Sequence, residues 1–496
     1  MQASICLNHN TGTFHYFFQK VEFWEILHYI YCRKLNTMKN TFILKGDICW
    51  SSASKTLETV DNGFILCNNG KSGGVFREIP GQYADLPLKD HSGKLIIPGL
   101  TDLHTHAPQF AFRALGMDMA LLEWLNKNTF PEEAKYKDLG YAREAYGHFI
   151  DLVKKGPNTR LCVFATIHVP ATLLLMDMLE ESGLVSLVGK VNMDRNCPEY
   201  LREEDSEGAT REWLELFKKR HKERPYKNTA PIITPRFVPS CSDSLMKSLA
   251  GIQREYGLSV QSHLSENIKE IEWVRELCPK SAHYAGAYAD NELLGDKTIM
   301  AHCVWSGKKE MDLLAEKETY IAHCPQSNTN LSSGIAPVRR FLEKGIHLGL
   351  GSDVAGGVHS SIFRAITDAI QVSKLRQTFY LQSIGSALDD REVSETREKA
   401  LTLEEAFYLG SAGGGSFFGK LRPEHNPDNS GDSAAGLAAG PAGSFVAGYD
   451  FDALVIDDSS LWGPRKLNLR DRLERVVYLS DDRHITGKYV RGIQIL

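Results

Sequence analysis

Eight short apolar runs alternate with helical patterns from about residue 95 onward, and this alternation constrains the fold more than any other feature. The runs are KLIIPGLTDLHTH, RLCVFATIHV, LVGKVNM, APIITPRF, GLSVQSHLSE, KTIMAHCV, TYIAHCPQ and GIHLGLGSD. Stretches such as ATLLLMDMLEES and SLMKSLAGIQREYG lie between them, with apolar residues at helical spacing. Apolar strands separated by helices indicate parallel βαβ units. Eight such units predict an α/β fold, a (β/α)8 TIM-like barrel, rather than an open doubly wound sheet.

The two ends of the chain have a different pattern. Residues 38–94 contain turn signals such as NNGKSGG and short strand-like runs, and DFDALVIDDSS and HITGKYVRGIQIL also predict strands. We therefore predict a small β-sandwich domain formed by residues 38–94 and 445–496, flanking a barrel over 95–425. Residues 426–444 are rich in Gly and Ala and are predicted to be a flexible surface insertion. Residues 1–37 are interpreted as an extension of unknown role, with Met38 as an alternative start.

Composition limits the classes of partner. The 496 residues carry a formal net charge of −5 with both signs interspersed, so neither a nucleic-acid surface nor a surface for an anionic membrane is indicated. The ten cysteines are scattered without a C-x-x-C pair, which favours reduced thiols in a cytoplasmic protein. FHYFFQKVEFWEILHYIY is the candidate membrane span, but charged residues interrupt it and it lacks the signal-peptide pattern.

Polar residues lie at the carboxyl ends of the predicted strands, which is where the active-site residues of a (β/α)8 barrel are found. They are His104 and His106 (first run), Arg236 and Phe237 (fourth), His263 with Glu266 (fifth), His302 (sixth), His323 (seventh) and Asp353 (eighth). Each has an ordinary alternative, such as a buried hydrogen-bonded histidine or a helix-capping aspartate. Together they favour a metal site, because imidazoles plus one carboxylate suit zinc. Strand alternation predicts that Cys303 and Cys324 face the opposite way, into the core.

A cation at such a site lowers the pKa of a bound water to about 7 and so supplies hydroxide at neutral pH. Hydroxide attack also requires a proton shuttle near the metal that is not itself a ligand. Glu266 lies three residues beyond His263 and is placed for that role. Its ordinary alternative, a carboxylate in the first turn of a helix, is compatible with the catalytic one.

These residues resemble the amidohydrolase superfamily. The segments SHLSE, AHC, AHCPQSN and LGSD are similar to the branch that hydrolytically deaminates heterocyclic rings. The segments HAPQFAF, LLEWLNKNTFPEE and PRFVPSCS narrow the resemblance to the guanine deaminase family. The resemblance covers about residues 40–496, and the chain departs from the family pattern in its first 37 residues and near 428–444. Neither departure touches a predicted strand end.

The resemblance implies one Zn²⁺ per chain, with Fe²⁺ or Mn²⁺ as substitutes. The implied ligands are His104, His106, His263 and Asp353. Two roles remain open for His302, which would be a further ligand or would hold the attacking water. Glu266 would be the proton shuttle, and Asp353 would also orient the hydroxide.

The resemblance also assigns the substrate contacts. Gln109 and Arg236 would bind the polar edge of guanine, where O6 and N7 accept hydrogen bonds. Phe237 would cover the flat face of the base. The same site includes His263, Glu266 and Asp353. Trp124 has two interpretations, as a pocket wall or as a core residue.

The implied reaction is hydrolysis at C2 of guanine to give xanthine and ammonia, with Glu266 taking the water proton and protonating ring N3. The implied partners are guanine and water, and a homodimer is expected. One alternative is a sister amidohydrolase acting on adenosine-like, cytosine or triazine rings, against which only Gln109, Arg236 and Phe237 argue. A more remote alternative is a catalytically inactive scaffold, which the complete set of expected ligands disfavours.

Overall fold

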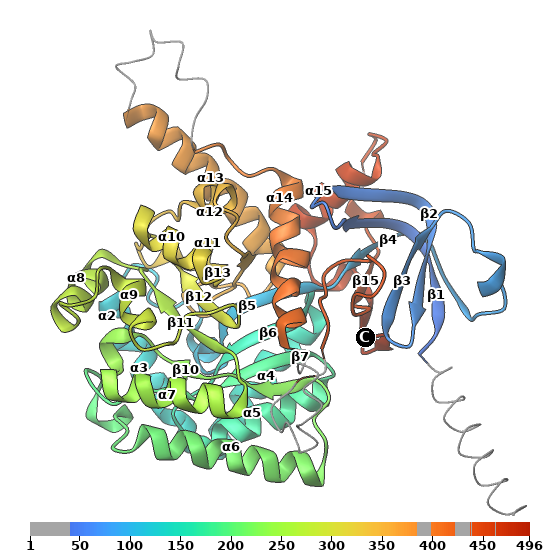
Figure 1. Ribbon diagram of the computed structural model, residues 1–496. Coiled ribbons are helices and arrows are strands. Elements are labelled where there is room, and N and C mark those ends of the chain that lie inside the picture. The colour runs from blue at the N-terminus through green and yellow to red at the C-terminus, as the bar shows by residue number, and fades with distance from the viewer. Residues whose placement is uncertain (1–39, 384–397, 422–436, 438, 462) are drawn as a thin grey trace, which may run out of the picture.

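The computed structural model describes residues 40–383, 398–421, 437, 439–461 and 463–496. They form a larger body of strands and helices with a smaller sheet beside it (Figure 1). The predicted extension over 1–37 and the first part of the predicted insertion lie outside the described residues. In the described ranges, no helix has the length and apolar character needed to cross a membrane.

Two four-stranded parallel sheets form the centre of the larger body, in the orders β5-β6-β7-β9 and β11-β12-β13-β14. Each run predicted from the sequence overlaps one of these strands. Their bounds are β5 (Leu100–His106), β6 (Asn158–Phe164), β7 (Val185–Gly189), β9 (Thr229–Pro231), β11 (Val260–Leu264), β12 (Thr298–His302), β13 (Tyr320–His323) and β14 (Leu348–Leu350). A short parallel pair, β8 (Val191–Asn192) with β10 (Thr234–Pro235), forms a separate two-stranded sheet.

Backbone hydrogen bonds join the edges of these two sheets. After β14, Asp353 N donates to His104 O at 2.8 Å, so this segment runs beside the end of β5. On the other side, Ile233 N donates to Ser259 O at 2.9 Å, just before β11. Because neighbouring strands are parallel, their carboxyl ends lie at the same end of the body.

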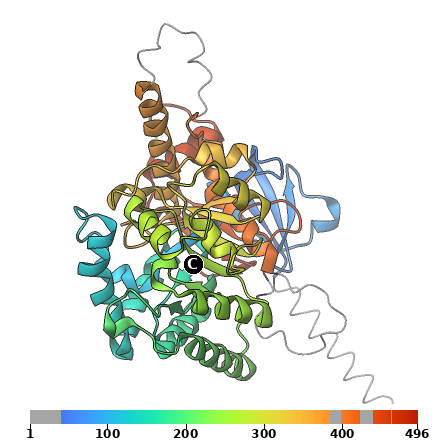
Figure 2. The same cartoon turned by 60° about the vertical axis from the view of Figure 1, so that its left-hand side comes forward.

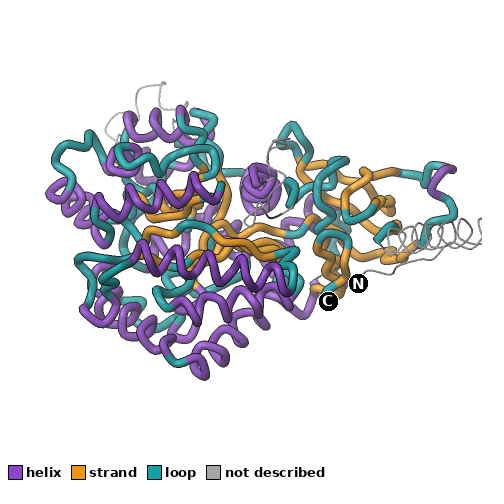
Figure 3. Tube along the Cα trace, turned by 60° about the horizontal axis from the view of Figure 1, so that its bottom comes forward, coloured by secondary structure: helices purple, strands orange, loops and turns teal. Residues whose placement is uncertain are grey.

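Helices lie around these strands (Figure 3). Every residue of β6 is buried, as expected for a parallel strand covered on both faces. The helices are α2 (Leu121–Trp124), α3 (Phe130–Ala134), α4 (Leu139–Lys155), α5 (Val169–Ser182), α6 (Ser206–Glu223), α7 (Asp243–Tyr256), α8 (Ile268–Leu277), α9 (Tyr284–Ala289), α10 (Lys308–Glu316), α11 (Pro325–Asn330), α12 (Val338–Glu343), α13 (Ile362–Ser383) and α14 (Leu403–Tyr408). Local chemistry sets their ends: the Asp138 carboxylate caps α4 by accepting from Gly140 N, and Gly257, with φ of 66°, ends α7.

The smaller body is a seven-stranded sheet in the order β17-β16-β15-β4-β1-β2-β3, built from both ends of the described chain. Its N-terminal strands, in blue, lie at one side of the larger body (Figure 2). Its strands are β1 (Phe42–Ser51), β2 (Leu57–Asn68), β3 (Lys71–Phe76), β4 (Leu88–Pro98), β15 (Ala453–Ile456), β16 (Ile485–Val490) and β17 (Ile493–Gln494). We predicted a sandwich, whereas β15 pairs with both β4 and β16 and so joins the two ends in one mixed sheet. The helix α15 (Leu469–Leu479) was not predicted.

Two further predictions need correction. The boundary at residue 95 falls inside β4, which continues to Pro98. Gly99 makes the turn into β5, where a Cβ would lie only 2.3 Å from the Thr159 side chain. The described part of the predicted surface insertion is buried apart from the half-buried Pro441, and Ala439 packs with Phe417 and Phe418 in a hydrophobic cluster.

Candidate active site and metal centre

Three histidines and one aspartate from three strand ends meet in the structure. His104 and His106 end β5, and their Nε2 atoms are 3.2 Å apart. His263 Nε2, from β11, is 3.2 Å from His106 Nε2. Asp353 Oδ1, in the segment after β14, lies 3.1 Å from His104 Nε2 and 3.3 Å from His106 Nε2. The structure therefore brings together residues that are up to 249 positions apart in the chain.

Hydrogen bonds on the outer side of two rings determine which nitrogen faces this centre. His263 Nδ1 is 2.5 Å from the backbone oxygen of Arg236, and His302 Nδ1 is 2.9 Å from Asn328 Oδ1. Both partners accept hydrogen bonds, so Nδ1 carries the proton and Nε2 presents a lone pair. Within the described chain, His302 Nε2 has no hydrogen-bond partner. It lies 3.7 Å from Asp353 Oδ2.

This arrangement fits a bound cation. His104, His263 and His302 offer nitrogen atoms within 4.8 Å of one another, and Asp353 adds a carboxylate. Burial lowers the pKa of His106 to about 4 and holds the pKa of His263 well below its ordinary value, so these rings are neutral, as metal ligands must be. Burial opposes ionisation of Asp353, but the neighbouring His104 holds its pKa well below the ordinary value. Neutral imidazoles around a carboxylate are a donor set for zinc.

Glu266 lies next to this centre, just after β11. Its Oε2 is 3.5 Å from His302 Nε2, and its Oε1 accepts a hydrogen bond from Ser333 Oγ at 3.1 Å. Burial and the nearby charge of Asp353 raise the pKa of Glu266 to about 8. A carboxyl group with a pKa near neutrality can both take up and release a proton at about pH 7.

A pocket opens beside these groups and is lined by His106, Gln109, Leu121, Trp124, Leu125, Arg236, Phe237, His263, Glu266, Glu270, His302, Leu331 and Asp353. All the residues predicted for catalysis and substrate binding are in this set. Both interpretations of Trp124 hold, since it lines the pocket and belongs to the hydrophobic core. The pocket has an apolar side, from α2 and its neighbours, and a polar side that can orient a flat ring.

Gln109 and Arg236 are held by a residue that the sequence reasoning did not identify. Gln109 Nε2 donates to Glu133 Oε1 at 3.0 Å. The Arg236 guanidinium donates to both oxygens of Glu133, at 2.6 Å and 3.2 Å. Asn328 and Ser333, which orient His302 and Glu266, were also missed. For Glu133, the only signal was its position in the family-like segment TFPEE.

The backbone around the centre is strained. His302 and Asp353 have φ of 73° and 46°, in the left-handed region that glycine normally occupies. Such residues cost about 1–3 kcal/mol each and concentrate at functional sites. Cys303 and Cys324 are both fully buried among the core residues, as predicted. Cys324 does not face away from the centre, however, because its sulfur lies within 4.8 Å of the ligand atoms of His104 and Asp353.

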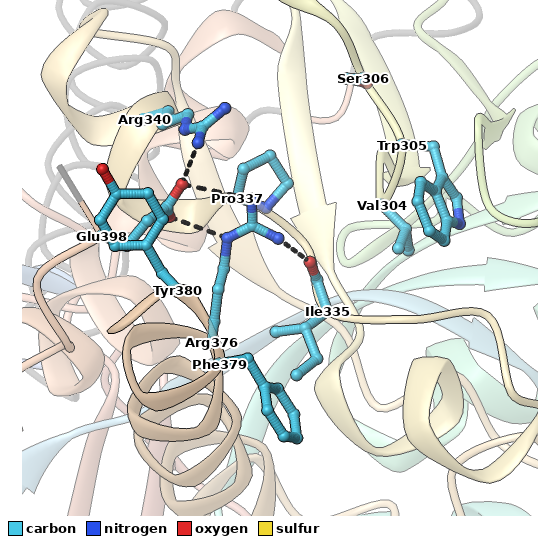
Figure 4. A pocket seen from close by; sticks show the side chains of 10 residues that line it. All are labelled: Val304, Trp305, Ser306, Ile335, Pro337, Arg340, Arg376, Phe379, Tyr380 and Glu398. Carbon is cyan, nitrogen blue, oxygen red and sulfur yellow. Dashed lines mark hydrogen bonds and ion pairs between the residues drawn. The ribbon is translucent and has the colours of Figure 1, made fainter. Parts of the chain in front are cut away.

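A second pocket is lined by the segment after β12, by residues at α12 and α13, and by Glu398 (Figure 4). Trp305, Pro337 and Phe379 line it, together with two arginines and Glu398. Arg376 Nε donates to Glu398 at 2.8 Å, and Arg340 pairs with the same carboxylate. None of the predicted site residues lines this pocket.

The sequence of the chain is similar to those of known members of the amidohydrolase family. A model of the amidohydrolase family matches residues 95–417. The chain belongs to the amidohydrolase family. This amidohydrolase is 38% identical over 412 residues to guanine deaminase of Dictyostelium discoideum, covering 82% of this chain and 83% of that protein. It is 36% identical over 413 residues to guanine deaminase of Homo sapiens, covering 81% and 83%.

The fold is also similar to that of a solved guanine deaminase structure. The amidohydrolase superimposes on guanine deaminase from C. acetobutylicum, crystallised with guanine in the active site, with a TM-score of 0.81 and 40% sequence identity. The match covers 92% of this chain and 100% of that one.

Proposed function

We propose that this amidohydrolase is a zinc-dependent guanine deaminase, a hydrolase of cyclic C–N bonds that converts guanine to xanthine and ammonia. The observation that carries the proposal is the position of Glu266. This buried carboxyl group lies 3.5 Å from His302 Nε2 and lines the same pocket as Gln109 and Arg236. The similarity to guanine deaminases over most of the chain supports the choice of ring.

The proposed metal ligands are His104, His106, His263 and Asp353, with His302 as a further ligand or as the residue that holds the attacking water. Iron or manganese also suits such a set of nitrogen and oxygen donors. When bound, the metal would lower the pKa of a water molecule to about 7 and polarise it for attack.

The residues of the chain supply the remaining chemistry. Glu266 takes a proton from the attacking water and delivers it to N3 of guanine, and its raised pKa lets it perform both transfers. Asp353 orients the water on the side facing C2. Arg236 and Gln109 bind the polar edge of the ring, and Phe237 packs on its face. A second proton transfer then allows ammonia to leave C2.

We also propose a closed barrel as the architecture that positions these residues. The eight parallel strands are taken as the closed (β/α)8 barrel, with the active site at their carboxyl ends. The domain limits proposed around it are 100–421 for the barrel and, for the end sheet, the described residues of 40–99 and 445–496. A homodimer and a cytoplasmic location remain predictions.

The test is a panel of rings offered to the purified, zinc-loaded protein. Guanine, adenosine, cytosine and an amino-triazine are compared by release of ammonia, and xanthine is followed by its ultraviolet absorbance. The proposal expects guanine to give by far the highest kcat/KM. If the protein deaminates another ring but not guanine, the proposed activity is wrong and the chain is a sister amidohydrolase with a different substrate. If it deaminates none of the rings, the result favours an inactive scaffold.

A further inference from the structure

Glu133 is a buried carboxylate beside the pocket that the chemistry above does not use. It lies in α3 and is 2% exposed, and its partners Gln109 and Arg236 are equally buried. One oxygen of Glu133 accepts from both partners, and the other accepts from Arg236 alone. A buried bidentate arginine–carboxylate pair of this kind has strict geometric requirements.

The first consequence concerns the amide of Gln109. Its Nε2 donates to Glu133, and its Oε1 accepts from Ala355 N at 3.3 Å. Reversing the amide would set its oxygen against a carboxylate and its amino group against an N–H. Glu133 and Ala355 N therefore permit only one orientation of the Gln109 side-chain amide. In this orientation the Gln109 amino group, including the hydrogen that is not bonded to Glu133, lies on the Glu133 side.

The second consequence concerns Arg236. Its guanidinium is 3% exposed, so its charge requires the compensation that Glu133 provides. The backbone oxygen of Arg236 also accepts from His263 Nδ1, so this residue connects the substrate side of the pocket to the proposed metal side. Two N–H groups of the Arg236 guanidinium donate to Glu133. The other N–H groups of Arg236 can donate to a bound ring.

We propose that Glu133 is a specificity-determining residue, which selects purines with a carbonyl oxygen rather than an amino group at C6. The proposal rests on the proposed guanine deaminase activity. By fixing Gln109 and Arg236, Glu133 presents N–H donors to the ring edge, and O6 of guanine accepts from them. The 6-amino group of 2,6-diaminopurine is itself a donor and would leave buried donors unpaired. Both purines carry the same 2-amino group, so only the C6 substituent differs.

The test compares Glu133→Gln with Glu132→Gln, the same change one residue earlier in α3. Glu132 is also buried, but it pairs with Lys135 and Tyr141 and does not line the pocket. In Glu133→Gln we expect kcat/KM for guanine to fall about 10- to 100-fold, mainly through KM, because a hydrogen bond to a charged group is lost. The preference for guanine over 2,6-diaminopurine should fall about 10-fold or more, while Glu132→Gln keeps the wild-type preference.

Metal content and thermal unfolding establish that the variants are folded. Should Glu133→Gln fail to fold, Glu133→Asp takes its place, because it keeps the charge but is too short for both partners and should also lose preference for guanine. A wild-type purine preference in a folded Glu133 variant would overturn the Glu133 proposal alone. If the wild-type protein deaminates neither purine, the proposed function fails first, and the specificity proposal fails with it.

Discussion

Asn328→Leu tests how the proposed metal ligands are oriented. Asn328 Oδ1 accepts from His302 Nδ1 at 2.9 Å, and both side chains are 1% exposed. Leucine fills a similar space without an acceptor. It therefore leaves a buried N–H unpaired, at a cost of about 1–3 kcal/mol. With about 1.4 kcal/mol per factor of ten, the affinity for zinc should fall about 5- to 150-fold.

The affinity is measured by competition with a chromophoric chelator at fixed pH. Thr329→Val is the matched control, since among the described residues Thr329 Oγ1 bonds only within its own helix, to Pro325 O at 2.9 Å. Weaker zinc binding in Asn328→Leu identifies His302 as a ligand. Unchanged binding with reduced turnover would assign His302 to the attacking water instead. A variant with wild-type affinity and wild-type turnover would refute the argument that Asn328 sets the proton position on His302.

Three further predictions concern the shuttle, the packing and the stability. Glu266→Gln should retain zinc and lose about 10²- to 10⁴-fold in kcat, measured with guanine, because the proton shuttle is removed. Gly351→Ala should lower zinc content measured by metal analysis, since the new Cβ would lie 2.9 Å from Cβ of His104. Burial opposes ionisation of Asp450, but Arg160 holds its pKa below the ordinary value, so its stabilisation is lost as the pH falls below about 4. Asp450→Asn should flatten that acid dependence in denaturant unfolding.

The strands of the larger body and most of the site residues could be predicted from the sequence because the fold is built from parallel strands. In a parallel α/β fold the carboxyl end of every strand lies at the same end of the body, so a strand-end residue such as His263 can be placed before its neighbours are known. The resemblance to guanine deaminases then singled out Gln109, Arg236 and Phe237. The structure places all of them in one pocket.

Other features depend on contacts that no local pattern encodes. Glu133 lies 24 residues from Gln109 and 103 residues from Arg236, and it occupies a helix of only five residues. Burial of Cys324 could be predicted from its apolar run, but its closeness to His104 and Asp353 depends on how the first, seventh and eighth strand ends pack together. The left-handed backbone at His302 is likewise fixed by the packed surroundings and not by its own residue type.

The most direct test of the central claim is the isotopic composition of the product. The zinc-loaded protein is incubated with guanine in water enriched in the heavy oxygen isotope, and the purine and the released ammonia are quantified by mass spectrometry and enzymatic assay. The account predicts xanthine with one labelled oxygen per molecule and one ammonia released for each xanthine formed. Guanine recovered unchanged, or a product without the label, would contradict hydrolytic deamination by this site.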